Sequence, residues 1–564
     1  MNNKIFNKTA IDVLKKRYLL KDKNMKIVET PDQMFKRVAK HAAKAEKKQN
    51  RKKTEQEFYR TMSNLDFLPN SPTLMNAGTQ LGQLSACFVI PIEDSIQQIF
   101  EALKQMAIIH QSGGGTGFNF SKIRPEGDII HKSKGTASGP ISFIKIFDKA
   151  AEIIKQGGRR RGANMGILEV NHPDILKFIK LKQTEKLENF NISVAITNKF
   201  MQSVKKNKTI KLINPRTKKA VKEIKARKIF HALVESAWSC GDPGILFMDE
   251  INSKNLLKLG RLNAVNPCGE QPLYDYESCN LGSINLANMV IKKEMDWEKL
   301  RQTIRIGVQF LDDILEVNKF PFKEIEKNTK ANRKIGIGVM GFAEMLIKLK
   351  ISYKSEEAVK TAEKTMKFIN EEARKKSEEL GKQKGNFPNK EKSKLAKKYK
   401  HMRNATVTTI APTGTISIIA GTSSAIEPLF ALIFERKIMD SKIFFEINKL
   451  FEKELKRRGL YKEELLDKVA RAGSIKQIKE IPKDMKKIFV TSMDIKPEQH
   501  VKIQAEFQKH IDNAVSKTVN LPFKATKKQI AKIFMQAYEM KCKGITVYRY
   551  GSKGSQVFNV CTTC

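Results

Sequence analysis

From Asn70 to about Tyr550 the chain alternates short apolar runs with segments of helical periodicity, and this alternation restricts its possible folds more than any other feature. Glycine and proline separate the apolar runs, as expected for strands and their connections. The segment from Ile96 to His110 is typical of the intervening helices. Because strands that alternate with helices build layered α/β sheets or barrels, we expect an α/β fold here.

The two ends of the chain have a different character. Thr30 and Pro31 form an N-cap and first-turn pair that opens a helix, so we expect residues 1–69 to be a small helical region. Residues 70–550 then form the α/β region, in which a long amphipathic helix should begin after Ser355 and end at Gly381. Residues 551–564 have little apolar content and predict a flexible tail.

The net charge of +45 raises the alternative of a basic nucleic-acid-binding protein. The lysines, however, are spread over most of the chain and alternate with glutamates in stretches such as residues 355–382. This pattern is typical of solvated helix faces, and no known nucleic-acid-binding motif accompanies it. We therefore predict no dedicated nucleic-acid site.

Neither a secretion signal nor a membrane span is expected. Residues 1–20 contain no continuous apolar segment, and the most apolar stretch, residues 405–420, is interrupted by Pro412 and Gly414. Seven cysteines are too few for a disulfide scaffold in a chain of 564 residues. They are typical of catalytic or buried thiols in a reducing compartment, so we expect a cytoplasmic protein without membrane contact.

The segment Asn266-Pro-Cys-Gly-Glu270 brings three reactive side chains together. In an extended backbone Asn266, Cys268 and Glu270 would share one face. Pro267 and Gly269 disfavour a central strand, so the segment is expected to be an extended loop that enters a cavity. Taken alone, the motif is equally compatible with a turn that has a buried cysteine and an exposed glutamate.

Four further motifs occur in a fixed order with this loop: Asn70-Ser-Pro-Thr-Leu-Met-Asn-Ala-Gly78, Ser85-Ala-Cys-Phe-Val89, Ser278-Cys-Asn-Leu-Gly-Ser-Ile-Asn285 and Ala411-Pro-Thr-Gly-Thr-Ile-Ser417. Together they resemble the large chain of ribonucleotide reductases over residues 70–549. The resemblance implies a ten-stranded α/β barrel of two antiparallel five-stranded halves, with the loop as a central finger. It also implies reduction of ribonucleotides, with diphosphates favoured, to 2′-deoxyribonucleotides for DNA synthesis.

The resemblance assigns roles to the finger loop. Cys268 would become a transient thiyl radical that takes the 3′-hydrogen of the ribose. Glu270 would accept the proton of the 3′-hydroxyl, and Asn266 would hold the sugar hydroxyls by hydrogen bonds. These roles suit the residue types, because a carboxylate can act as a general base whereas an amide orients a hydroxyl without competing for its proton.

The same resemblance implies a redox function for other cysteines. Cys87 and Cys279 match the pair that is oxidised to a disulfide, although two buried core cysteines are the alternative. Cys561 and Cys564 match a tail dithiol that reduces this disulfide and is itself reduced by thioredoxin or glutaredoxin. Half of a zinc site is the alternative for the tail, but no second pair is nearby, and no metal site is predicted. Cys240 and Cys542 are expected to be core residues.

Two nucleotide sites follow from the resemblance. The expected substrate-binding residues are Ser71, Ala86, Cys87, Gly115, Asn266, Pro267, Cys268, Gly269, Glu270, Pro412, Thr413, Gly414, Thr415 and Ile416. The expected residues for a deoxynucleoside triphosphate effector are Asp94, Arg124, Gly158, Arg159, Arg160, Arg161 and Gly162, with residues 122–135 as a companion loop. A homodimer built around the effector site is expected.

The segment Thr546-Val-Tyr-Arg-Tyr550 bears on how the radical is made. Reductases with a separate metal-bearing subunit have two adjacent tyrosines here, whereas this chain has Arg549 at the second position. The sequences of residues 112–118 and 159–165 resemble those of the adenosylcobalamin-dependent branch of the family. Adenosylcobalamin is therefore the expected cofactor, and no protein ligand to its cobalt is expected. A reductase that needs a metal-radical subunit and an inactive barrel relative are the alternatives, and the complete cysteine set disfavours the latter.

Overall fold

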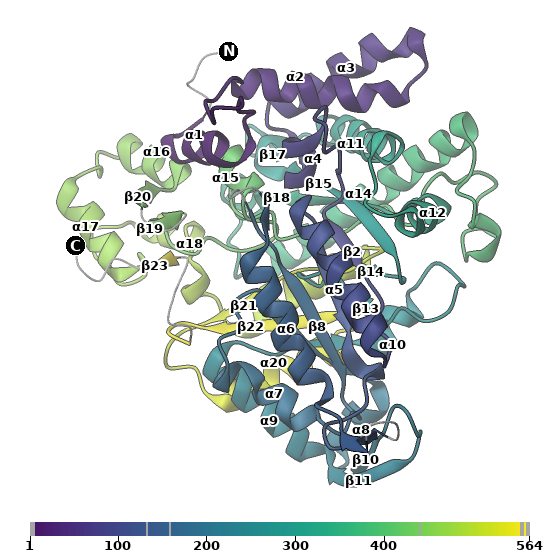
Figure 1. Ribbon diagram of the computed structural model, residues 1–564. Coiled ribbons are helices and arrows are strands. Elements are labelled where there is room, and N and C mark those ends of the chain that lie inside the picture. Colours follow the sequence, from purple (N-terminus) through teal and green to yellow (C-terminus); the bar gives the residue numbers. More distant parts are fainter. Residues whose placement is uncertain (1–5, 131–133, 157–159, 439–441, 553–557, 560–564) are drawn as a thin grey trace.

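The N-terminal part is helical in the computed structural model, which describes residues 6–130, 134–156, 160–438, 442–552 and 558–559 (Figure 1). It contains α1 (Lys8–Val13), the π-helix Leu14–Tyr18, α2 (Pro31–Ala42) and α3 (Lys48–Ser63). The expected cap is present, because Thr30 and Gln33 form a capping box at the start of α2. Phe35 and Phe58 belong to the same hydrophobic core as Phe310 of α11 (Trp297–Val317), so these helices pack directly on the barrel.

Five parallel strands make the first half of the barrel: β2 (Cys87–Val89), β3 (Gly115–Asn119), β8 (Asn164–Glu169), β9 (Phe190–Ile196) and β12 (Gly244–Phe247). Helices connect them and cover the outside: α5 (Ile96–Gln111), α6 (Gly139–Ile153), α7 (Ile175–Thr184), α8 (Asn198–Lys205) and α9 (Ala226–Cys240). Their buried apolar side chains, such as Phe118 of β3, Ile167 of β8, Val194 of β9 and Ile245 of β12, pack against these helices or toward the barrel interior.

The second half uses β15 (Glu277–Asn285), β18 (Ile335–Met340), β21 (Thr518–Leu521) and β22 (Gly544–Arg549). A fifth, irregular segment lies between β18 and β21, where parallel bridges join Ile337 to Thr408 and Ile410 to Val515. The covering helices are α11, α12 (Lys323–Asn332), α13 (Phe342–Lys348), α14 (Glu356–Lys384), α19 (Pro497–Lys509) and α20 (Lys527–Glu539).

The two halves run in opposite directions and meet at two seams. β15 is antiparallel to β2 at one seam, and β12 is antiparallel to β22 at the other. The prediction of a ten-stranded barrel made of two antiparallel halves is therefore confirmed. β1 (Phe67–Pro69) extends the sheet by pairing with the far end of β15.

The finger loop lies inside this barrel because glycine makes room for it. The loop is flanked by the short strands β13 (Ala264–Val265) and β14 (Pro272–Leu273), which pair with each other. A methyl group at Gly117 of β3 would lie 1.7 Å from the carbonyl oxygen of Val265. One at Gly115 would lie 2.8 Å from Cγ of Pro267. The glycine-rich run therefore lets the loop pass directly over β3.

The long helix α14 differs from its prediction at one end. Ser355 caps its first turn, as expected, but the helix continues to Lys384 and ends at Gly385, which has a φ of +87°. Gly381 lies inside the helix, where a methyl group would approach the backbone nitrogen of Met402 to 2.6 Å. The expected stop at Gly381 is wrong, because this glycine serves the close approach of another segment.

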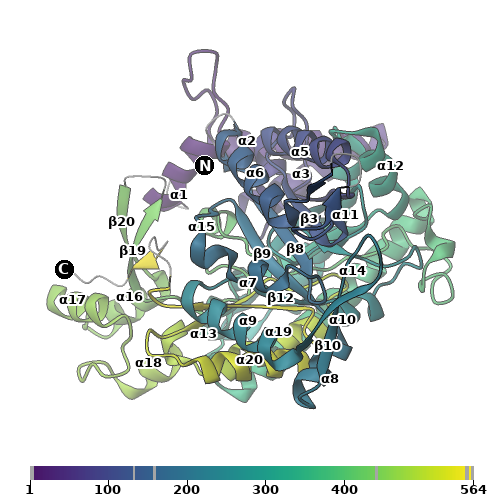
Figure 2. The ribbon, with the colours of Figure 1, turned by 60° about the horizontal axis from the view of Figure 1, so that its bottom comes forward.

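A smaller unit projects from one side of the barrel (Figure 2). It contains β19 (Ile433–Ile438), β20 (Lys442–Ile447), α16 (Lys449–Arg457), α17 (Glu463–Ala472) and α18 (Lys483–Ile488), and β23 (Phe558–Asn559) pairs with β19. The remaining elements are short: α4 (Ser71–Asn76), β4 (Ile129–Ile130), β5 (Gly135–Thr136), β6 (Lys155–Gln156), β7 (Arg160–Arg161), β10 (Thr209–Ile213), β11 (Ala220–Lys225), α10 (Met248–Ser253), β16 (Val290–Ile291), β17 (Glu294–Met295) and α15 (Ile416–Ala420). None of the described helices has the length and apolar character needed to cross a lipid bilayer.

Candidate active site

The finger loop is a tight turn and not the extended segment that the sequence led us to expect. The backbone nitrogen of Gly269 donates to the carbonyl of Asn266 over 3.0 Å, and Gly269 has a φ of +81°. The Asn266 side chain closes the turn, because its Oδ1 accepts from the backbone nitrogen of Gln271 at 3.0 Å. Asn266 and Glu270 are consequently buried, whereas Cys268 at the tip is exposed.

Asn266 and Glu270 both contact Cys87, the first residue of β2. Nδ2 of Asn266 donates to Sγ of Cys87 over 3.0 Å, and the Cys87 thiol lies 3.9 Å from Oε1 of Glu270. Cys279 of β15 is directly opposite Cys87 across the antiparallel seam, and both are free thiols. Residues directly opposite in such a ladder have Cα atoms about 4.5–5.5 Å apart, which is within the range of a disulfide.

Both members of this cysteine pair are buried, and burial determines their ionisation. Burial raises the pKa of the Cys87 thiol well above its usual value, and the neighbouring Glu270 carboxylate raises it further. The pKa of Cys279 is also raised, first by burial and then by the Glu277 carboxylate. The two sulfurs are therefore held as protonated thiols at neutral pH, ready to donate hydrogen rather than to attack as thiolates.

Cys268 at the tip of the finger loop borders a cavity of about 590 Å³. Pro267 and Gly269 lie beside it, and β9, β12, β21 and β22 form one wall, which includes Tyr548. Residues between 412 and 431 and the end of β20 form the opposite wall. The volume lies within the range of small-molecule sites. Cys268 is thus open to a bound group, while Asn266 and Glu270 face the cysteine pair.

Comparisons with known proteins agree with this arrangement. The family described as ribonucleotide reductase, barrel domain, matches residues 85–402 and 398–548, and the ribonucleotide reductase, all-alpha domain, matches residues 5–82. This chain belongs to the ribonucleotide reductase family. The family prediction made from the ordered motifs is confirmed.

Named relatives of this reductase chain are similar over almost all of its length. It is 49% identical, over 98% of its residues and 80% of the relative, to a vitamin B12-dependent ribonucleoside-diphosphate reductase of Thermoplasma acidophilum. It is 45% identical, with the same coverage, to a protein of that name from Mycobacterium tuberculosis. The class Id ribonucleotide reductase alpha subunit of Actinobacillus ureae has a similar structure, with a TM-score of 0.81, 24% identity and 98% of each chain covered, which shows a shared fold.

One residue of the turn expected to bind the substrate phosphates lies in the same cavity as Cys268. Pro412 lines the cavity beside Cys268, and Thr413 is fixed by a hydrogen bond that its Oγ1 accepts from the Ala425 nitrogen at 2.7 Å. Gly414 lies in open space, where a methyl group would meet no atom within 4 Å. Thr415 and Ile416 lead into α15.

Of three further residues expected to bind substrate, two lie on a strand or directly beside one, and the third begins a helix. Ala86 directly precedes Cys87 and is partly buried, and Gly115 is covered by Pro267. Ser71 begins α4, where its hydroxyl is 2.7 Å from that of Tyr18. The structure thus brings the finger loop and the cysteine pair together, whereas Ser71 contacts the N-terminal helical region.

Two of the residues expected to bind the effector contact each other. Nε of Arg124 donates to Oδ2 of Asp94 over 2.8 Å, and both side chains are about a quarter exposed. Gly162 packs against His110, since a methyl group there would lie 2.1 Å from Nδ1 of the imidazole. The backbone of β7, Arg160–Arg161, pairs with β6. Gly158, Arg159 and the tail cysteines Cys561 and Cys564 lie outside the described residues.

Arg549 has a clear structural role. Its guanidinium lies 4.3 Å from the centre of the Trp238 ring and 5.4 Å from that of Phe523. Nε of Arg549 also donates to the carbonyl of Trp238 over 3.0 Å. The position that holds a second tyrosine in metal-subunit reductases is therefore filled here by a cation fixed between two aromatic rings.

Some residues that support the site could not be recognised from the sequence. Nδ2 of Asn191 donates to the carbonyl of Pro267 over 2.8 Å, and Oγ1 of Thr409 donates to that of Glu270 over 3.0 Å. Both stabilise the finger loop through its backbone, and neither occurs in a motif. Of the two cysteines expected in the core, Cys542 is fully buried, but Cys240 is only half-buried. The expectation for Cys240 is wrong, because this last residue of α9 is only half-buried and its thiol donates to the backbone carbonyls of Ser236 and Asp242 instead of packing in the apolar core.

Proposed function

We propose that this chain reduces ribonucleoside diphosphates to 2′-deoxyribonucleotides by cysteine radical chemistry that depends on adenosylcobalamin. The observation that supports this most strongly is the place of the finger loop. Cys268 borders an open cavity on one side, while Asn266 and Glu270 on the same loop contact the buried thiol Cys87. A radical can therefore reach Cys268 from the cavity and act on a sugar held beside the cysteine pair.

Each side chain has a chemical task in this proposal. The Cys268 thiyl radical takes the 3′-hydrogen of the ribose, and Glu270 accepts the proton of the 3′-hydroxyl. Cys87, held as a thiol, gives its proton to the leaving 2′-hydroxyl, which departs as water. Cys87 and Cys279 then supply two electrons and become a disulfide, and Cys268 returns the hydrogen to C3′. Asn266 holds the sugar hydroxyls throughout.

The cavity beside Cys268 fits the adenosyl part of the cofactor. When bound, adenosylcobalamin supplies an organic radical through cleavage of its cobalt–carbon bond. Ser193, Asn520 and Thr546 line the cavity and offer hydrogen-bonding groups, and the relatives named above are called vitamin B12-dependent. No histidine occurs among the described residues that line it, so we expect no cobalt ligand from this wall.

The two nucleotide sites are part of the same proposal. The turn from Pro412 to Ile416 would hold the substrate phosphates through backbone amides. Asp94, Arg124 and the arginine-rich turn at residues 158–162 would bind a deoxynucleoside triphosphate, since guanidinium groups suit phosphate oxygens. Asp94 and Arg124 are close enough to form one binding surface, because they already contact each other.

A homodimer is supported by an exposed apolar face on α5 and α6. Ile96 and Phe100 on α5 are 59% and 48% exposed, and Ile146 and Ile153 on α6 are 40% and 71% exposed. They follow helical spacing and form stripes on two helices that contact each other. Exposed apolar side chains on neighbouring helices are typical of a protein–protein interface, and α5 begins directly beside Asp94. A second copy of this chain is the partner that we propose.

The C-terminal segment would renew the cysteine pair. Phe558 and Asn559 pair with β19, whose partner strand β20 ends at the cavity, so the chain reaches the active-site side two residues before Cys561. Cys561 and Cys564 would exchange thiols with the disulfide and then be reduced by thioredoxin or glutaredoxin. None of the five described cysteines forms a disulfide, which suits the reducing cytoplasm.

The direct test is an anaerobic assay of the purified chain with each ribonucleoside diphosphate, a dithiol and adenosylcobalamin. We expect deoxynucleotide formation without any second protein. If activity appears only after a metal-bearing subunit is added, that subunit and not adenosylcobalamin is the radical source. Salt-sensitive DNA binding without turnover would instead favour the nucleic-acid-binding alternative.

A further inference from the structure

A buried ion pair lies close to Cys279, on the same strand and on the segment that follows α12. Nζ of Lys334 is 2.7 Å from Oε2 of Glu277, and the two side chains are 2% and 0% exposed. Removing two charges from water is costly unless their remaining hydrogen-bonding atoms are satisfied. The finger-loop chemistry described above does not use this pair, so its presence next to a redox cysteine requires an explanation.

The surroundings satisfy both members of the pair. Oε1 of Glu277 accepts from Nδ2 of Asn332 at 2.8 Å, and Oε2 also accepts from the backbone nitrogen of Tyr274 at 2.8 Å. The Lys334 ammonium lies 4.7 Å from the centre of the Tyr274 ring and donates to the carbonyl of Pro272 over 3.4 Å. Pro272 belongs to β14, so the pair connects β15 to the base of the finger loop.

Cys279 is coupled to this pair through both its strand and its sulfur. Glu277 and Cys279 are two residues apart on β15, so their side chains lie on the same face. The thiol of Cys279 donates to the backbone carbonyl of Lys334 over 3.5 Å. The Glu277 carboxylate raises the pKa of this thiol beyond the effect of burial, and the Lys334 ammonium lowers it. The two charges therefore act on Cys279 in opposite directions.

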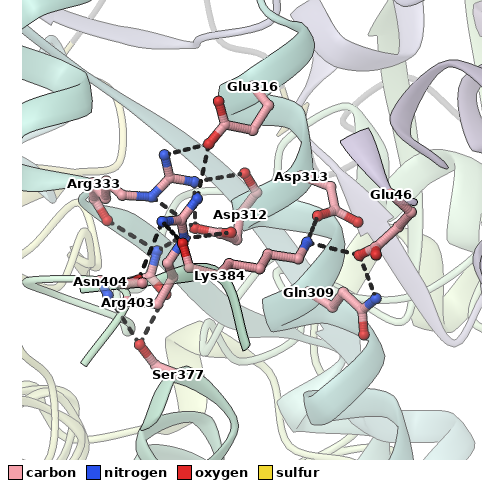
Figure 3. A network of polar contacts seen from close by, with 11 residues as sticks. Glu46, Gln309, Asp312, Asp313, Glu316, Arg333, Ser377, Lys384, Arg403 and Asn404 are labelled. Carbon is pink, nitrogen blue, oxygen red and sulfur yellow. Dashed lines mark hydrogen bonds and ion pairs between the residues drawn. The ribbon is translucent and has the colours of Figure 1, made fainter. Parts of the chain in front are cut away.

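Arg333, the residue before Lys334, belongs to a network of polar contacts (Figure 3). Arg333 has a φ of +47°, and its guanidinium contacts Asp312 at 2.7 Å and Glu316 at 2.6 Å. Nδ2 of Asn404 donates to the Arg333 carbonyl over 3.1 Å. Because these contacts fix the backbone at Arg333, the next residue is directed away from this network, toward Glu277 and Cys279.

Cys87 has different surroundings from Cys279. Sγ of Cys87 accepts a hydrogen bond from Asn266 of the finger loop, whereas the thiol of Cys279 donates to the Lys334 carbonyl on the far side of the pair. When the two cysteines form a disulfide, a thiolate that enters from the side of the finger loop reaches the sulfur of Cys87. The sulfur of Cys279 is then the leaving group.

We propose that Lys334 is a positioning residue that stabilises the Cys279 sulfur as it leaves during reduction of the Cys87–Cys279 disulfide, with Glu277 limiting this effect. This inference rests on the proposed function, which makes the disulfide in each turnover. A thiolate of an external dithiol attacks Sγ of Cys87 and forms a mixed disulfide. The bond to Cys279 breaks, and its sulfur takes the electron pair as a thiolate on the strand face that also carries Glu277 and its ion-pair partner Lys334.

The remaining steps return both cysteines to thiols. The Cys279 thiolate takes up a proton from solvent and becomes a thiol. The second thiol of the dithiol then attacks the mixed disulfide and releases Cys87. The dithiol is oxidised to a disulfide, and the cysteine pair gains two electrons and two protons. A better-stabilised leaving thiolate makes the first bond cleavage faster.

The test uses chain oxidised with diamide, without ribonucleotide or cofactor. Dithiothreitol is added, samples are quenched and denatured, and mass spectrometry of alkylated peptides measures how fast Cys87 and Cys279 become free thiols. We expect Lys334→Met to slow this reduction by about tenfold and Glu277→Gln to accelerate it. If the Glu277–Lys334 pair were only a structural link, either substitution would loosen the packing around the disulfide, and both variants would be reduced faster than wild type. That result would overturn the proposal, and so would reduction rates equal to wild type.

Controls separate charge from folding. Lys334→Arg keeps the charge and should reduce at close to the wild-type rate, and the double variant Glu277→Gln/Lys334→Met removes both buried charges and should fall between the single variants. Lys384→Met is the matched control, because it breaks another buried pair, with Asp313, and should leave the rate unchanged. If diamide fails to join Cys87 to Cys279, the proposed function itself is contradicted, whereas altered reduction rates bear only on Lys334.

Discussion

Replacement of Gly117 by alanine tests whether the finger loop must lie directly over β3. The added methyl carbon would lie 1.7 Å from the carbonyl oxygen of Val265, whereas real contacts of this kind stay beyond 3.0 Å. Because the nearest atoms are backbone, the loop or the strand must move by at least about 1.3 Å, the difference between these two distances. A displacement of about 1 Å at a reacting group lowers the rate by about 10²-fold. We therefore expect Gly117→Ala to lower kcat by about 10²-fold.

The variant is assayed for deoxynucleotide formation, and its free energy of unfolding is measured by urea denaturation. Overpacking should lower that free energy by about 1–3 kcal/mol, so the chain should still fold. Gly166→Ala on the neighbouring strand β8 is the control. Its methyl group would lie 3.2 Å from Cδ1 of Phe190. Because this neighbour is a side chain that can shift, we expect nearly normal activity. A folded Gly117→Ala protein with more than a third of the wild-type kcat would refute this reasoning.

Three further predictions concern the thiols, the dimer and the tail. In the native, reduced protein at pH 8, iodoacetamide should modify Cys268 well before Cys542, because Cys268 is exposed whereas burial raises the pKa of Cys542 to about 12. Peptide mass spectrometry measures the two modification rates, and equal rates would contradict the described burial. Phe100→Glu and Ile153→Glu should each weaken self-association at least about tenfold in sedimentation experiments, because each places a charge on the exposed apolar face; an unchanged dissociation constant would exclude this face. Replacement of Cys561 and Cys564 by serine should abolish turnover driven by thioredoxin but not turnover driven by dithiothreitol, and equal loss with both reductants would exclude a relay role for the tail.

The sequence predicted the parts of the fold that follow from local chemistry. The Thr30–Pro31 cap and the start of α14 after Ser355 were correct, because capping depends on adjacent residues. The stop at Gly381 was wrong, because the approach of Met402 that requires this glycine is a tertiary contact. The barrel itself followed from a resemblance between ordered motifs, since alternation of strands and helices alone allows either layers or a barrel.

The candidate site was predictable to a similar extent. The finger loop and the cysteine pair could be named from motifs, and β2 and β15 place the two cysteines opposite each other. The shape of the loop could not be predicted, because the left-handed backbone of Gly269 closes a turn where an extended segment was expected. Asn191, Thr409 and Lys334 support the site through backbone carbonyls or buried charge, and nothing in their local sequence indicates these contacts.

The central claim is that Cys268 starts a reaction whose electrons come from Cys87 and Cys279. Its most direct test is a single turnover, in which the chain is reduced, freed of dithiol and mixed anaerobically with a ribonucleoside diphosphate and adenosylcobalamin. With the tail cysteines replaced by serine, we expect up to one deoxynucleotide per chain and an equal amount of the Cys87–Cys279 disulfide, measured by peptide mass spectrometry. Cys268→Ser should give neither. Deoxynucleotide formed without this disulfide, or formed by the Cys268→Ser variant, would contradict the account.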